Sequence, residues 1–90
     1  MSNTYYRRRN PFAMAAVRRG MGLVIPPVAA AFGISCADIT SRGRKSPRIS
    51  RARQVVMAHL SRMGHTHGDI SAAFHCGPSS VSYAIYRVTR

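Results

Sequence analysis

Histidine and cysteine side chains have the most versatile chemistry in this sequence. His65 and His67 flank a single residue, His75 and Cys76 are adjacent, and His59 stands apart. This spacing matches none of the common zinc motifs, so we expect no metal site and no cofactor. A Cys/His or Ser/His nucleophile would need a third, orienting group and an oxyanion hole, and the sequence offers no pattern for either. We therefore expect a protein that is not an enzyme.

Charge is the strongest signal. The 90 residues include 14 Lys and Arg but only two acids, Asp38 and Asp69, which gives a formal net charge of +12. Two acids far apart in the chain do not supply the paired carboxylates of a glycosidase or a carboxylate-rich metal site. A charge of this size favours a polyanionic partner, and arginine suits phosphate because a guanidinium can bind it in a bidentate way. An apolar fraction of 46% is too high for a disordered basic tail.

The two cysteines and the apolar stretch of the chain give an expectation for its cellular compartment. Cys36 and Cys76 are far apart in the chain and indicate no disulfide framework, which predicts the reduced thiols of the cytoplasm. The apolar stretch 21–34 follows several arginines and loosely resembles a signal peptide. Pro26 and Pro27 interrupt it, however, and we expect it to be too short to span a bilayer. The predicted location is cytoplasmic and nucleoid-associated, without membrane contact.

The first part of the chain predicts two short helices separated by glycines. Asn10-Pro11 is typical of a helix start, and Gly20 and Gly22 would end that helix. Its inward face would carry Phe12, Ala15 and Ala16. A second helix would begin near Ile25, with Pro26-Pro27 tolerated in its first turn. We therefore divide the chain into a basic N-terminal arm with a short helix, residues 1–22, and a domain at residues 23–90.

The remaining elements also read as short helices. The segment 35–38 fits a capping box that opens a short helix with Ile39 facing inward. Residues 40–50 form a basic loop, and Ser50 would cap the longest helix, which runs from Arg51 to Met63. Thr66 and Asp69 form another capping box, and a turn at 76–78 leads into a last helix, 79–88. No segment alternates for long enough to be a strand. The predicted fold is all-α, a small bundle of five or six short helices.

Residues 67–88 follow the pattern of a helix-turn-helix. A helix of about two turns carries Ile70 and Phe74, a turn contains Gly77, and the second helix starts with small hydroxyl residues. Burial of Val81, Ala84, Ile85 and Val88 would direct the following side chains outward: Ser79, Ser80, Ser82, Tyr83, Tyr86 and Arg87. Small residues at a helix start allow close approach to the floor of the major groove. The alternative is a helical hairpin that only packs and has no DNA contact.

From Val28 onward the sequence resembles the C-terminal DNA-binding domain of the bacterial replication initiator DnaA. The matching segments are 28–39, the basic loop Ser41-Arg42-Gly43-Arg44, Ser50-Arg51-Ala52-Arg53-Gln54, 69–74 and 79–81. The resemblance implies a DnaA/Trp-repressor-like fold in which Arg53 enters the minor groove while Arg42, Arg44 and Lys45 follow phosphates. The recognition helix would open at residues 77–80, which keep the two hydroxyl positions of the family's Asp-His-Thr-Thr. The chain has no Gly-x4-Gly-Lys-Ser/Thr loop, so it resembles a stand-alone relative without the ATPase.

These observations predict a double-stranded DNA-binding protein of a bacterium or phage, and specifically a transcription regulator that recognises a sequence. The alternatives are an architectural protein that coats DNA with little sequence preference, and a replication-linked DnaA-like factor. The arm with Arg7, Arg8 and Arg9 would contact DNA, or would be a disordered terminus that only adds charge. Residues 11–25 are a candidate docking site for RNA polymerase or another protein. The predicted DNA-binding residues are Arg42, Arg44, Lys45, Arg48, Arg51, Arg53, Gln54, Ser79, Ser80, Ser82, Tyr83 and Arg87.

Overall fold

The computed structural model describes residues 11–41 and 46–89, which form five α-helices and no strand. They are α2 (Pro11–Phe32), α3 (Cys36–Thr40), α4 (Pro47–Arg62), α5 (His67–Phe74) and α6 (Pro78–Thr89). The all-α class predicted from the sequence is confirmed. Several predicted DNA contacts lie outside the described residues, namely Arg7, Arg8, Arg9, Arg42, Arg44 and Lys45.

α2 is one continuous helix of 22 residues, so the prediction of two short helices was wrong. Its buried residues are Met14, Val17, Gly20, Ile25, Val28 and Ala29. Together with the partly buried Met21 and Val24 they recur every three or four positions. A single apolar face therefore continues through the glycine pair and the proline pair, and its packing outweighs their local helix-breaking preference.

The proline pair lies on the solvent side of α2. Pro26 and Pro27 are both exposed. A proline has no N–H to offer the carbonyl four residues earlier, which here leaves the carbonyls of Gly22 and Leu23 without a helical partner. Both of these residues are exposed, so water can reach the two carbonyls and the helix can continue.

The N-terminal turns of α2 bury a different face from the one predicted. Phe12 is 83% exposed and Ala15 is also exposed, whereas Met14 and Val17 are buried. The difference is one of register. In a helix that continues to residue 32, the face set by Ile25 extends back through positions 21, 17 and 14 rather than through Phe12.

Two of the predicted caps are confirmed. The Ser35 side chain caps α3 by accepting a hydrogen bond from the Asp38 N–H at 3.1 Å, and the Asp38 carboxylate accepts from the Ser35 N–H at 3.2 Å. Thr66 caps α5 by accepting from the Asp69 N–H at 3.1 Å. The bonds of Ser35 and Asp38 are reciprocal, as in the predicted capping box, and the Thr66 bond supplies one half of that pattern.

α4 begins earlier than predicted, because Ser46 and not Ser50 is its cap. The Ser46 hydroxyl accepts from the N–H of Ile49 at 3.3 Å, and Pro47 occupies the first helical position. Proline is favoured there because its φ is already helical and its missing N–H would have no partner. The residues Arg48 and Ser50 therefore belong to the first turn of the long helix rather than to a loop.

A turn separates α5 from α6, one residue earlier than the predicted turn at 76–78. Residues 75–77 join the two helices, and His75 adopts a left-handed conformation with φ of 58°. Such a φ is uncommon outside glycine, although histidine is among the residues enriched there. Val81 and Ala84 are buried as predicted, whereas Ile85 and Val88 are half-buried.

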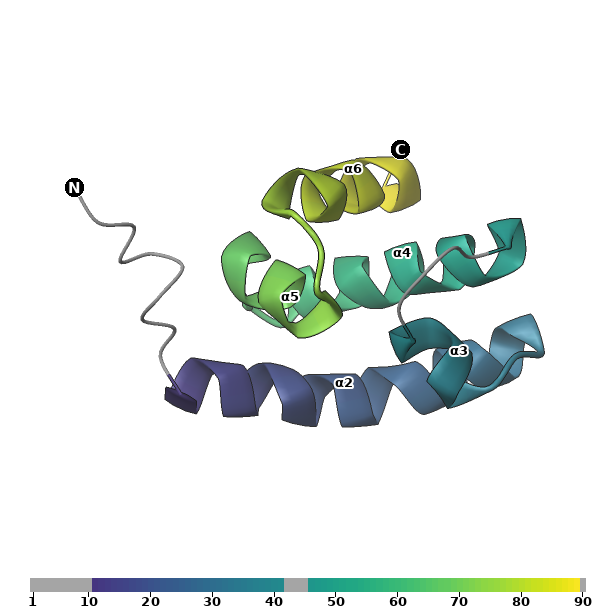
Figure 1. The fold of residues 1–90 in the computed structure, drawn as a ribbon, viewed down its shortest axis with the longest axis horizontal. Coiled ribbons are helices and arrows are strands. Elements are labelled where there is room, and N and C mark those ends of the chain that lie inside the picture. The colour runs from purple at the N-terminus through teal and green to yellow at the C-terminus, as the bar shows by residue number, and fades with distance from the viewer. Residues whose placement is uncertain (1–10, 42–45, 90) are drawn as a thin grey trace.

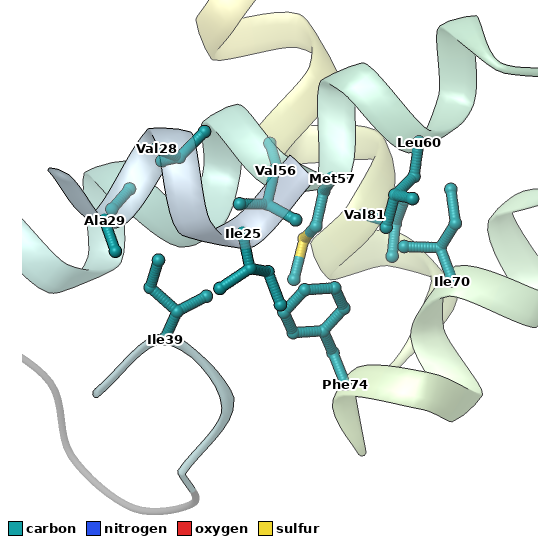
Figure 2. Close-up of a cluster of buried hydrophobic side chains, with 12 residues drawn as sticks. Ile25, Val28, Ala29, Ile39, Val56, Met57, Leu60, Ile70, Phe74 and Val81 are labelled. Atoms are coloured by element: carbon teal, nitrogen blue, oxygen red, sulfur yellow. The ribbon is translucent and has the colours of Figure 1, made fainter. Parts of the chain in front are cut away.

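α4 lies at the centre of the bundle, with α2 on one side and α6 on the other (Figure 1). It contacts each of the other four described helices. The core draws on all five (Figure 2), with Ile25, Val28 and Ala29 from α2, Ile39 from α3, Val56, Met57 and Leu60 from α4, Ile70 and Phe74 from α5 and Val81 from α6. This shared core holds α4 and α6 side by side as one unit.

α2 has the length and apolar composition of a helix that could cross a membrane. The prediction that the apolar run is too short was therefore wrong on length, because the helix joins the segments on both sides of the glycines. Buried helices of globular proteins and N-terminal signal sequences have the same property. In the structure α2 packs against α3, α4 and α5.

Candidate nucleic-acid interface

Two adjoining hollows lie between α4 and α6. One, of about 270 Å³, is lined by Ser50, Arg53, Gln54, Met57, Cys76, Ser80, Tyr83 and Ala84. The other, of about 240 Å³, is lined by Pro47, Ser50, Arg51, Gln54 and Arg87. Ser50 and Gln54 border both. The fold thus brings together six predicted DNA-binding residues from two helices, one of which is Arg53. We call the surface formed by the other five the α4–α6 face: Arg51, Gln54, Ser80, Tyr83 and Arg87.

Arg87 and Tyr83 form a pair on this face. The Arg87 Nη1 donates a hydrogen bond to the Tyr83 hydroxyl at 3.0 Å, and the guanidinium carbon lies 5.7 Å from the centre of the Tyr83 ring. Tyr83 is 53% exposed. The pair holds the guanidinium near the hollow while leaving its other donors available to a ligand, since an arginine carries five N–H donors.

The α4–α6 face carries positive charge without any acidic residue. Neither α4 nor α6 contains Asp or Glu, and the two acids of the chain lie on α3 and α5. Arg51 is exposed, and no hydrogen bond or ion pair of its side chain is found within 11–41 and 46–89. Two arginines from neighbouring helices therefore border one hollow, an arrangement that a bound anion would stabilise.

Gln54 lies between the two hollows and has an unsatisfied oxygen. Its Oε1 is buried and has no hydrogen-bond partner among the described residues. A buried acceptor without a donor costs about 1–3 kcal/mol. The same side chain borders both hollows, and its spare bonding capacity is that of an acceptor, which suits an N–H or O–H of a ligand, such as a base amino group, and not a phosphate oxygen.

The helix starts next to this face also favour anions. The first turns of α4 and α6 contain no acidic residue. Arg48 lies in the first turn of α4, where the positive end of the helix dipole disfavours a cation. Ser79 and Ser80 lie in the first turn of α6 and are both exposed. The arginine is thus placed where it does not stabilise its own helix but where a phosphate would be stabilised.

Arg53 has a structural role that the sequence did not predict. Its Nη1 donates to the carbonyl of Ile39 at 2.6 Å and to that of Ser41 at 3.3 Å, and its guanidinium carbon lies 5.1 Å from the centre of the Phe74 ring. The side chain therefore connects α4 to the end of α3 and to α5. Burial lowers the pKa of Arg53 from its ordinary value, and the nearby Cys76 partly offsets this effect. The guanidinium remains charged at physiological pH.

The other predicted residues of α4 and α6 lie around the α4–α6 face. Ser82 points toward α5, where its Oγ is 3.1 Å from Nδ1 of His67. Ser79 and Arg48 are exposed. Arg48 precedes Arg51 by three residues, so the two lie on the same side of α4 and form a row of cations along its first turns.

Two residues of the hollows were assigned other roles from the sequence. Ser50, predicted as the cap of α4, and Cys76, which lies in the turn before α6 as predicted, both line the larger hollow. The only sequence signal for Ser50 is its position one helical turn before Gln54. Both cysteines are free thiols, with Cys36 exposed and Cys76 half-buried. Burial raises the pKa of the Cys76 thiol, and the Arg53 charge partly counteracts it.

The His, Cys, Asp and Glu side chains of the described residues form no metal centre. In the part of the chain that the structure describes, no three His, Cys, Asp or Glu side chains gather closely enough to hold an ion.

Comparisons with protein-family models, with curated proteins and with solved structures returned no match for this chain. The candidate interface is therefore defined by its own geometry and charge.

Proposed function

We propose that this chain binds double-stranded DNA and that α6 is the helix that enters the major groove. The observation that carries this proposal is the α4–α6 face, on which Arg51 and Arg87 converge beside polar side chains with no acidic residue in either helix. The two positive charges on neighbouring helices repel each other. A phosphate bound between them would attract both guanidinium groups and so offset this repulsion. The net charge of +12 supplies the long-range attraction to a polyanion.

The arrangement of α5 and α6 supports the same proposal. A two-turn helix, a turn of residues 75–77 and a longer helix are the parts of a helix-turn-helix. The exposed Ser79 and Ser80 at the start of α6 are small enough for the backbone to approach base edges, and hydroxyls bond either bases or phosphates. Tyr83 and Arg87 follow one and two turns later, where they would contact the backbone.

The resemblance to the DnaA C-terminal domain supports a DnaA/Trp-repressor-like arrangement with a basic loop beside the reading helix. On this proposal the loop cations Arg42, Arg44 and Lys45, which lie outside the described residues, bind phosphates in addition to Arg48 and Arg51. Arg51 then contacts DNA from the exposed surface, whereas Arg53, whose Nη1 is hydrogen-bonded to carbonyls of the protein, lines the larger hollow and offers DNA only its remaining donors. The protein would act in the cytoplasm as a transcription regulator.

The experiment that tests this proposal is a selection of bound fragments from a pool of random duplexes, using the purified full chain. A recovered motif would support a regulator that reads sequence. Strong binding without a motif would replace the regulator with the architectural, DNA-coating alternative. Failure to retain any duplex at moderate ionic strength would contradict DNA binding itself.

A control selection should use the double variant Arg51→Ala/Arg87→Ala. If the α4–α6 face holds DNA, this variant retains much less duplex than the parent chain, because each charged contact with phosphate contributes to affinity. Equal retention by the two proteins would place the DNA-binding surface elsewhere on the chain.

A further inference from the structure

A long uncharged surface lies on α2, the helix on the opposite side of α4 from α6 (Figure 1). No charged residue occurs from position 20 to position 37 of a chain with net charge +12. Leu23 in this segment is 72% exposed, although single exposed apolar residues are normal in soluble proteins. The surface becomes informative because its apolar residues border a groove.

The groove lies between α2 and α4 and has a volume of about 430 Å³. Leu23, Pro27, Ala31 and Phe32 line it from α2, and Val55 and His59 line it from α4. All but His59 are apolar. A concave apolar site of this size accepts side chains or small apolar groups, and a groove between two helices is a common seat for the apolar face of a third.

Cations mark one end of this groove. Arg19 precedes Leu23 by four residues on α2, and Arg62 follows His59 by three residues on α4, so each lies on the groove side of its helix. The backbone of Gly20 lies against Leu60 and Met63, which places residues 19–20 of α2 next to the C-terminal turn of α4. The two exposed arginines therefore belong to the same end of the groove.

From this combination we propose that the α2–α4 groove is a docking site for an amphipathic helical segment of another protein, one whose apolar side chains enter the groove and whose acidic side chains face Arg19 and Arg62. Charge argues against a second copy of this chain, which has only two acids to offer. The concave form argues against a lipid surface, which receives protruding side chains. The inference is independent of DNA binding, because it uses a different surface.

The proposal is tested by selecting ligands for the full chain from a display library of random 16-residue peptides. We expect the enriched peptides to combine apolar residues at helical spacing with acidic flanks. Enrichment of basic or purely polar peptides, or no enrichment, would overturn the proposal. So would sedimentation with vesicles of anionic lipid that depends on Leu23, because the groove would then serve a membrane.

Substitutions in the groove then test whether the enriched peptide binds there. Leu23→Glu and Ala31→Glu each place a carboxylate in the groove at residues that are exposed, so the fold should persist, and each should weaken the enriched peptide about tenfold or more. Ala37→Glu is the matched control, since Ala37 is exposed on α3 and lines a different hollow of α2, and it should leave peptide binding unchanged. Equal losses for Ala31→Glu and Ala37→Glu would overturn the assignment to the groove. Duplex binding by Leu23→Glu should equal that of the parent, so the two proposals can fail separately.

Discussion

Arg53 joins three helices through one side chain, whereas Arg51, two residues earlier, projects from the surface. The difference arises from the carbonyls of Ile39 and Ser41 and the ring of Phe74, which surround Arg53 but not Arg51. In the sequence the two arginines belong to one Arg-x-Arg-Gln segment. Nothing local distinguishes them, because α3 and α5 reach Arg53 only through the tertiary fold.

Replacing Arg53 should therefore affect stability. Arg53→Ala removes charge-assisted hydrogen bonds to two backbone carbonyls and should lower the free energy of unfolding by about 1–3 kcal/mol. Arg51→Ala removes the same charge from an exposed site and should change it by less than about 0.5 kcal/mol. Urea denaturation followed by circular dichroism measures both values. Equal values for the two variants would show that the contacts of Arg53 contribute nothing to the fold.

The two cysteines should differ in reactivity. Burial raises the pKa of the Cys76 thiol, and Cys36 is exposed. At mildly alkaline pH a disulfide reagent should modify Cys36 faster than Cys76 by about tenfold or more. Reaction rates of the single variants Cys36→Ala and Cys76→Ala identify each thiol. Equal rates would contradict the half-buried position of Cys76 beside Arg53.

The same pKa shift has a consequence for stability. A thiol whose pKa is higher in the folded chain than in the unfolded chain contributes stability that is fully present below the unfolded pKa, about 8.5, and is lost as pH rises through the folded pKa. The parent should therefore lose stability above this pH relative to Cys76→Ala. Thermal unfolding measured from pH 8 to 10 tests this expectation. The control Cys36→Ala retains Cys76 and should lose stability with rising pH as the parent does. An identical pH profile for the parent and Cys76→Ala would refute the shift.

At the scale of elements, the close approach of α2 to α4 depends on Gly20. A Cβ at this position would lie 2.9 Å from Cδ2 of Leu60, which is fully buried. Gly22, half a turn away, is exposed, and a Cβ there would meet nothing within 4 Å. The packing of α2 against α4 therefore requires glycine at position 20 but not at position 22.

This difference predicts opposite effects of the same substitution. Gly22→Ala should raise the free energy of unfolding by about 0.5–1 kcal/mol, because alanine is the better residue in a helix interior. The free energy of unfolding of Gly20→Ala should be about 1–3 kcal/mol lower than that of Gly22→Ala, because the new methyl group at position 20 crowds Leu60. Denaturant unfolding of both variants provides the comparison. A destabilising Gly22→Ala would indicate that the helix ends at the glycine pair, as the sequence alone suggested.

Helix starts could be predicted from the sequence where a side chain itself makes the cap. Ser35 and Thr66 cap their helices as expected, because the bonding residues lie three positions apart and need no tertiary contact. The same reasoning misplaced the start of α4, because both Ser46 and Ser50 precede helical sequence and only Ser46 is followed by proline. The continuity of α2 could not be predicted locally, since it results from the face that packs on α3, α4 and α5.

At the scale of the whole molecule, the cationic α4–α6 face and the apolar α2–α4 groove are separate surfaces, and Arg19 and Arg62 lie at one end of the groove. Arg51 and Arg87 lie on the α4–α6 face, whereas the segment 20–37 around the α2–α4 groove has no charge. The sequence predicted the DNA-binding class from total charge, and it named the residues of the α4–α6 face individually. It could not show that Arg51, Gln54 and Arg87 share a hollow, because that depends on how α6 packs against α4.

The salt dependence of duplex binding tests this layout most directly. In fluorescence anisotropy titrations between about 50 and 200 mM salt, the log of the association constant should fall linearly with log salt, by about one unit of slope for each phosphate contact. Arg51→Ala/Arg87→Ala should reduce the slope by about two. Arg18→Ala/Arg19→Ala removes the same charge from α2 and should leave most of the slope in place. A flat salt dependence for the parent chain, or equal loss of slope in the two double variants, would contradict binding of DNA by the α4–α6 face.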